Sequence, residues 1–265
     1  MLIDCNAYVG HWPFRKLQEP TLDGLLYRMN RFGVDRALVS NINGIFYKFP
    51  DFANRELYEA LESETTCRER MIPFAVLNPV VPWWERALEE ADREMGMKGI
   101  RLYPRYHEYE LTDSRCVELV EAARDRGMVV AVPQRMVDPR QRSWMDTRRT
   151  VGFSELADLV RRVPDARYMM LDTRGNPGDE AREVLRESEV VFDSTRATGV
   201  PIRGLSGTSF QALTSAFGED RIVFGTGTPF IDYCSPFIRA AVWEEAGEET
   251  MDKIFHGNAR RLPEI

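Results

Sequence analysis

Eight short apolar runs, each followed by a segment with helical spacing, constrain the fold of this chain more than any other feature. They lie at residues 2–5, 37–40, 71–77, 99–103, 129–133, 168–171, 190–192 and 222–224. The runs contain few alternating polar positions, which is typical of strands buried on both faces of a parallel sheet. Eight such strand and helix units predict an α/β fold, a (β/α)₈ TIM barrel.

Local signals mark several boundaries of the predicted helices. Thr21 precedes a helix expected to end at Phe32, and Gly33 stands where a helix C-terminal glycine belongs. Ser154 is predicted to cap a helix over 155–163. The polar stretch 138–152 shows no clear period and is expected to be a long loop over one end of the barrel.

The length of 265 residues suits one barrel, so a single domain spanning 1–265 is predicted. An open, doubly wound sheet is the alternative architecture. The Gly-x-Gly-x-x-Gly motif that would favour this alternative does not follow the first run.

The net charge and the cysteine spacing limit which binding partners and which cellular compartment we expect for this chain. The formal net charge of -7 gives no reason to expect nucleic acid or an anionic membrane as partner. No apolar run approaches the roughly 18 residues of a membrane span, and no signal peptide opens the chain. The four cysteines are far apart, as in proteins with reduced thiols. We therefore expect a cytoplasmic protein, which could assemble as a homo-oligomer.

Polar side chains follow the predicted strands at their carboxyl ends, where barrels of this kind carry their active sites. In chain order they are Asn6, Tyr8, His11, Arg15, Asn41, Asn43, Asn78, Tyr103, Arg105, His107, Gln134, Arg135, Asp172, Arg174, Asp193, Ser194, Arg196, Thr226 and Thr228. Arginine binds carboxylates and phosphates bidentately, and 31 of the 35 basic residues are arginines. The set predicts a binding site for a small, anionic ligand. The alternative role of such residues is to form hydrogen bonds with backbone groups of the loops and with each other.

From this rim and the fourth strand we select candidates for two roles. The substrate-binding candidates are Asn6, Tyr8, His11, Arg15, Arg101, Tyr103, His107, Gln134, Arg135 and Arg174. The catalytic candidates are Asp172 and Asp193. For His11, a hydrogen bond that holds the following turn is as well supported as a substrate contact.

The histidine count disfavours a catalytic zinc site, which needs three ligands from histidine, carboxylate or cysteine side chains. The chain has only His11, His107 and His256. The last falls in a predicted helix, and the other two follow different strands.

Four segments match the motifs of a known family. Ile3-Asp4-x-Asn6-x-Tyr8-x-Gly10 stands where that family has Ile-Asp-x-His-x-His-x-Gly. The segment 221–229 reads Arg-Ile-Val-Phe-Gly-Thr-Gly-Thr-Pro, where Arg-Ile-x-Phe-Gly-Ser-Asp-x-Pro is usual. Gly-Met-Lys-Gly-Ile-Arg-Leu-Tyr at 96–103 and Gly-Asn-Ala-Arg-Arg-Leu at 257–262 complete the match. The chain resembles the amidohydrolase-related proteins of the metal-dependent hydrolase superfamily, which are (β/α)₈ barrels.

The resemblance implies that the metal-ligand positions are substituted. Asn6 and Tyr8 replace the first two histidines, Asp172 replaces the histidine after strand six, and Gly227 replaces the aspartate after strand eight. Gln134 or Pro133 stands for the histidine after strand five. Neutral amides do not hold zinc or similar metals tightly, so we expect no cofactor, no metal ligand and no tightly bound catalytic metal; weak binding of a divalent metal is the alternative.

Without a metal, hydrolysis needs an activated substrate. A metal lowers the pKa of bound water from about 15.7 to about 7, which corresponds to roughly 12 kcal/mol. The sequence therefore predicts a metal-free hydrolase for a small carboxylated or polyhydroxylated compound with a lactone or ester-like bond. Asp172 or Asp193 would be the general base, and arginines would stabilise the oxyanion. A non-catalytic ligand-binding protein and a decarboxylase or lyase of a small organic acid are the alternatives, the latter because the family resembles such enzymes.

Overall fold

Eight parallel strands lie side by side in chain order around one barrel in the computed structural model, which describes residues 1–198, 209–243 and 246–262. The strands are β1 Ile3–Val9, β2 Arg36–Asn41, β3 Met71–Leu77, β4 Gly99–Leu102, β5 Val129–Pro133, β6 Arg167–Leu171, β7 Val191–Asp193 and β8 Ile222–Val223. The Cys5 N–H donates to the Phe224 carbonyl at 2.8 Å, which links the last strand region to β1. The predicted single (β/α)₈ barrel is confirmed.

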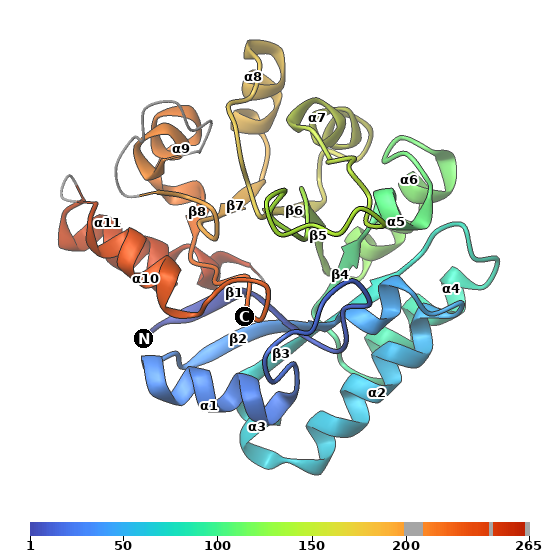
Figure 1. Ribbon diagram of the computed structural model, residues 1–265. Helices are drawn as coiled ribbons and strands as arrows, with labels where there is room; N and C mark the ends of the chain where they lie inside the picture. The colour runs from blue at the N-terminus through green and yellow to red at the C-terminus, as the bar shows by residue number, and fades with distance from the viewer. Residues whose placement is uncertain (199–208, 244–245, 263–265) are drawn as a thin grey trace.

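Helices form an outer ring around the strands (Figure 1). They are α1 Leu22–Phe32, α2 Pro50–Ser63, α3 Thr65–Arg70, α4 Trp84–Glu89, α5 Pro104–His107, α6 Ser114–Asp125, α7 Phe153–Arg162, α8 Asp179–Glu187, α9 Phe210–Phe217, α10 Cys234–Ala241 and α11 Glu248–Asp252. Single turns of 3₁₀ or π geometry are η1 Ile42–Ile45, η2 Glu90–Glu94, η3 Glu219–Arg221, η4 Lys253–Gly257 and η5 Ala259–Arg261. No helix within the described ranges has the length and apolar character needed to cross a membrane.

The observed ends of α1 and α7 can be compared with the capping residues predicted from the sequence. Thr21 caps α1 by accepting a hydrogen bond from the Gly24 N–H, and Gly33 closes the same helix in the left-handed conformation at φ +66°. The prediction that Ser154 caps α7 is wrong. The Glu155 carboxylate accepts the Gly152 N–H at 2.7 Å, and the helix begins at Phe153. The Glu155 carboxylate thus takes the place of a hydroxyl cap, and Gly152 has no side chain to return the bond.

An irregularity in β1 decides which of its side chains face the barrel interior. Ile3 and Cys5 pack with interior residues of the other strands, whereas Ala7 and Val9 pack against the α1 side. Strict alternation would put all four on one face. The pairing register with β2 shifts between Asp4 and Ala7, and such a bulge reverses the facing of the residues that follow it.

Asp4 anchors this bulge to the segment after β8. Its carboxylate accepts the Thr226 hydroxyl at 2.6 Å, the Thr226 N–H at 2.9 Å and the Asn6 N–H at 3.0 Å. Burial raises the pKa of Asp4, and these hydrogen bonds oppose that shift. Asp4 is therefore a structural residue that helps to close the barrel.

Two loops meet over the carboxyl ends of the strands. The predicted loop 138–152 contains turns and no helix or strand, and it lies beside the loop that follows β1 (Figure 1). Arg15 joins them by donating to Gln141 Oε1 at 2.9 Å and to the Phe230 carbonyl at 2.8 Å. The residues predicted to be functional lie in and below these loops.

Candidate active site at the mouth of the barrel

The centre of the mouth is a buried hydrogen-bond network around Asn6. Its Nδ2 group donates to Asp193 Oδ2 at 2.7 Å, to Thr195 Oγ1 at 3.1 Å and to Asp172 Oδ2 at 3.2 Å. The Thr195 hydroxyl also donates to Asp193 Oδ2. Only the amide nitrogen can donate to carboxylates, so the network fixes the orientation of the amide. Asn6 thus bridges the two predicted catalytic aspartates.

Arg196 supplies the positive charge of this network. Its Nε donates to Asp172 Oδ1 at 2.8 Å, and its NH2 group donates to the Met136 carbonyl at 3.3 Å. The two side chains are only 5% and 3% exposed. Because neither charge is solvated, each depends on the other for stabilisation.

Burial and the neighbouring Asp172 raise the pKa of Asp193 from 3.8 to about 7. Hydrogen bonds from Thr195, Asn6 and the Thr173 N–H oppose the shift without cancelling it. A carboxyl group with this pKa exchanges its proton near neutral pH, as general acids and bases do.

The backbone of Asp172 adopts a left-handed conformation, with φ +54°. Aspartate tolerates this region better than most residues, and the conformation is uncommon outside glycine. Such conformations concentrate at functional sites, where the surrounding structure holds them in place.

Below this network, Arg101 is stacked on Tyr8 inside the barrel. The guanidinium carbon lies 4.4 Å from the centre of the Tyr8 ring, and the group donates to the carbonyls of Ala7 and Leu38, each at 3.1 Å. Arg101 is 1% exposed, so these contacts replace its hydration. The arrangement gives Arg101 a structural role, and the Tyr8 hydroxyl is buried with no hydrogen-bond partner among the described residues.

An aromatic cluster covers the mouth. The Trp12 ring contacts Phe14, Phe46, Tyr106 and Phe230 edge-on, at centroid distances of 4.9 to 5.7 Å. Trp12 and Phe230 belong to the same buried cluster as the Tyr8 and Tyr103 rings. The loops at the carboxyl ends of the strands are therefore held together by aromatic packing.

Guanidinium groups surround the network on the side of β5 to β7. Burial lowers the pKa of Arg135, and repulsion by Arg174 and Arg196 lowers it further, while Asp138 and Asp172 oppose the shift. Arg174 is paired with Asp138 at 3.0 Å. Three arginines thus lie near Asp138, Asp172 and Asp193, and the group carries an excess of positive charge, which favours an anion, while Asp193 is protonated.

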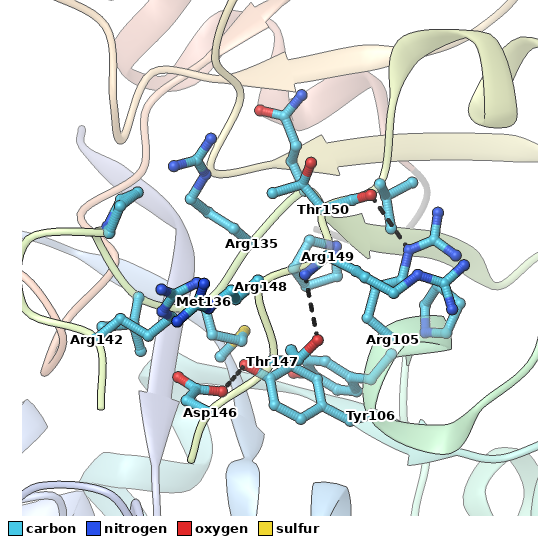
Figure 2. A pocket seen from close by; sticks show the side chains of 17 residues that line it. Arg105, Tyr106, Arg135, Met136, Arg142, Asp146, Thr147, Arg148, Arg149 and Thr150 are labelled. Atoms are coloured by element: carbon cyan, nitrogen blue, oxygen red, sulfur yellow. Dashed lines mark hydrogen bonds between the residues drawn. The ribbon is translucent and has the colours of Figure 1, made fainter. Parts of the chain in front are cut away.

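A cavity of about 250 Å³ opens beside the ends of β4 and β5 (Figure 2). Tyr103, Gln134 and Arg135 line it, and all three were predicted to bind substrate. Burial raises the pKa of Tyr103 to about 12, against the effect of Arg101. Gln134 connects the cavity to the rim, because its Oε1 accepts the Arg174 N–H at 2.6 Å.

The remaining predicted residues lie apart from this centre. His11 is exposed on its loop, where its backbone N–H donates to Asn43 Oδ1 at 2.7 Å. His107 lies on α5, and its Nε2 donates to the Ile45 carbonyl at 3.2 Å. Burial lowers the pKa of His107 to about 4. Arg15 links the two mouth loops.

Thr195 and Arg196 belong to the central network, although neither was selected as a site residue. Arg196 appears among the polar residues after strand seven, but sequence gives no sign that it pairs with Asp172 across two strands. The sequence feature that could have identified Arg196 as a site residue is its position three residues after Asp193, near the carboxyl end of a strand.

The residues at the mouth do not fit the divalent metal that family resemblance implies. Within the described ranges, no group of three or more histidine, cysteine, aspartate or glutamate side chains could hold a metal ion. Amide hydrogens of Asn6 and the guanidinium of Arg196 already bind the oxygens of the two aspartates. At Gly227, with φ +68°, a Cβ atom would lie 2.7 Å from Thr195 Cγ2, so the backbone there disfavours any ligating side chain.

The fold and the mouth define the class of protein as a (β/α)₈ barrel with a carboxylate and arginine site at its strand ends. The amidohydrolase family model matches residues 28–262. The chain belongs to the amidohydrolase family. No match to a curated protein is found.

Solved structures share the fold at low sequence identity. 2,6-Dihydroxybenzoate decarboxylase from Rhizobium is 14% identical with a TM-score of 0.70, and 98% of each chain is covered. Manganese-bound 5-carboxyvanillate decarboxylase from Novosphingobium aromaticivorans is 16% identical with a TM-score of 0.74, covering 99% of this chain and 95% of that one. A probable 2-pyrone-4,6-dicarboxylic acid hydrolase from Acinetobacter baumannii is 11% identical with a TM-score of 0.63, and 98% of each chain is covered.

Proposed function

We propose that this protein is a metal-free amidohydrolase-family hydrolase that opens a lactone or ester-like bond in a small carboxylated compound. The observation that carries the proposal is the buried pair Asp172 and Asp193, bridged by Asn6 and paired with Arg196. The pair combines a proton acceptor of near-neutral pKa with a fixed positive charge, the two elements that hydrolysis of an activated carbonyl requires.

In the proposed reaction, the aspartate pair takes a proton from water as the water oxygen forms a bond to the carbonyl carbon. The carbon–oxygen bond to the leaving alkoxide then breaks, and the alkoxide receives the proton. Nearby guanidinium groups of Arg135 and Arg174 attract the carboxylate of the substrate and the developing oxyanion. Both aspartates are buried, so the mouth of the barrel must open before substrate reaches them.

Metal content and turnover test the proposal together. Protein purified without chelator should contain no stoichiometric zinc, manganese or iron, and should hydrolyse members of a panel of small lactones and esters that bear a carboxylate. Asp172→Asn and Asp193→Asn should each lower kcat at least about a hundredfold, the usual contribution of a general base. Asp125→Asn, at an exposed residue of α6, is the matched control and should leave kcat unchanged.

Each failed outcome has a specific meaning. Stoichiometric metal would overturn the metal-free proposal. Ligands that raise the thermal midpoint but are recovered unchanged would identify a non-catalytic binding protein. Activity that survives in both aspartate variants would remove these residues from the mechanism.

Decarboxylation of a small aromatic acid is the second candidate, because two similar structures are decarboxylases. Carbon dioxide release from dihydroxybenzoates, without ester hydrolysis, would favour it. We further propose that the protein acts in the cytoplasm on a small anionic molecule, with no nucleic acid or membrane as partner, and that it can form homo-oligomers, which size-exclusion chromatography with light scattering would test.

A further inference from the structure

The cavity beside β4 and β5 contains more positive charge than its own carboxylates neutralise. Arg105 and Arg149, which line one part of it, are paired with glutamates outside it. Arg135, Arg142 and Arg148 have neither a hydrogen bond nor an ion pair from their guanidinium groups within the described part of the chain.

Two of these unpaired guanidinium groups are partly withdrawn from water. Arg135 and Arg142 are half-buried, and the Nε atom of each is fully buried without a partner among the described residues. The terminal NH1 and NH2 groups of both side chains have no acceptor within the described part of the chain and are not fully buried, so they are the groups that an anion in the cavity would contact. Figure 2 shows both side chains among the residues that line the cavity, with Arg142 close to Asp146.

Asp146 is the carboxylate on this wall, and it is already engaged. Its Oδ1 accepts the Tyr106 hydroxyl at 3.0 Å. The Arg142 charge acts on Asp146 as well, although burial still raises the pKa of Asp146. One aspartate therefore faces three unpaired arginines, and the cavity retains a positive excess.

The shape and the uncharged wall of the cavity restrict the anion. The volume of about 250 Å³ lies below the roughly 300–1,000 Å³ typical of drug-sized ligand pockets. The wall includes the side chains of Tyr103, Tyr106, Met136 and Val151. Aromatic and aliphatic surface of this kind favours a flat hydrocarbon body, and guanidinium groups favour a carboxylate attached to it.

We propose that this cavity is a binding site for a small planar carboxylate of one-ring size, whose carboxylate is held by Arg135 and Arg142. Arg142 distinguishes the site from the central network, because it lies on the loop 138–152 and does not contact the aspartate pair. Binding here does not require turnover, so its test is separate from that of the proposed hydrolysis.

Calorimetric titration of the full chain with benzoate tests the site. Saturable binding is expected, and Arg135→Gln and Arg142→Gln should each weaken it by about tenfold or more, as expected for loss of a charge-assisted hydrogen bond. Arg93→Gln, at an exposed arginine outside the cavity, is the matched control and should bind like the wild type. Benzamide, with the same shape and no charge, should not bind.

Four results would overturn the assignment. They are the absence of benzoate binding in the wild type, unchanged affinity in both cavity variants, weakening by Arg135→Gln alone, and phosphate binding as tight as that of benzoate. The third would place the ligand at the central network, and the fourth would remove the planar body from the proposal. Thermal midpoints of the ligand-free variants, compared with the wild type, separate loss of binding from loss of folding.

Discussion

Replacing Asp193 by asparagine should remove a pH-dependent loss of stability from this protein. The variant keeps an amide oxygen where Oδ2 accepts hydrogen bonds from Asn6 and Thr195. The one contact it loses is the long hydrogen bond from the Thr173 N–H, at 3.4 Å. The substitution therefore changes the titration of the site more than its packing.

The direction of the effect follows from the pKa of Asp193. Burial raises this pKa from 3.8 to about 7 in the folded protein, so the ionised form is disfavoured there. The stability contribution of Asp193 is complete below about pH 3.8 and is lost as the pH rises toward 7. Linkage between these two values predicts a loss of roughly 2–3 kcal/mol between pH 5 and pH 8, and about 4 kcal/mol in total.

Urea unfolding at several pH values between 5 and 8 measures this loss. The free energy of unfolding of the wild type should fall by roughly 2–3 kcal/mol relative to that of Asp193→Asn over this interval. Asp125→Asn, on the exposed surface of α6, should follow the wild-type profile. A constant difference between wild type and Asp193→Asn would show that Asp193 does not change its ionisation in this range, and would refute the reasoning.

Three further predictions follow from buried contacts. Arg196→Met leaves the buried Asp172 carboxylate without its cation, so the free energy of unfolding should fall by about 3–5 kcal/mol. The double variant Arg196→Met/Asp172→Asn should recover part of that loss. An absence of recovery would contradict the pairing. Trp12→Ala should lower the free energy of unfolding in urea by about 3–5 kcal/mol, because its ring is buried in the aromatic cluster. Trp144→Ala, at a residue 82% exposed, is the control and should change this free energy by no more than about 0.5 kcal/mol. Equal effects of the two substitutions would exclude the proposed packing of Trp12. The NMR signals of the His107 imidazole should titrate near pH 4, because burial lowers its pKa to about 4, and a midpoint near 6.5 would disprove this.

The strand ends show how far sequence patterns predict a site. Asn6, Asp172 and Asp193 follow apolar runs, and parallel strands in a barrel bring their carboxyl ends to one mouth. The structure places these three side chains in one network. All three were selected for their position directly after an apolar run, and the parallel strands of the barrel bring those positions to one end.

Other residues required information that no local pattern contains. His11 lies two residues after β1 and was selected with Asn6, yet its side chain is exposed, whereas Asn6 lies within β1 and is buried. Arg101 was selected from the fourth strand as a substrate-binding residue, but its guanidinium is stacked on Tyr8 inside the barrel. The pairing of Arg196 with Asp172 joins residues from two strands, and only their packing brings them together.

The sequence by itself determined the eight strand and helix units, the end of α1 at Gly33, and the set of polar residues at the strand ends. These depend on periodicity and on local backbone preference, which are encoded within a few residues. The tertiary structure alone decided that the β1 bulge turns Asn6 and Tyr8 inward, that an aromatic cluster covers the mouth, and that Asn6 and Arg196 bind the two aspartates. Facing, burial and pairing depend on contacts between distant segments, and those contacts form only when the barrel closes.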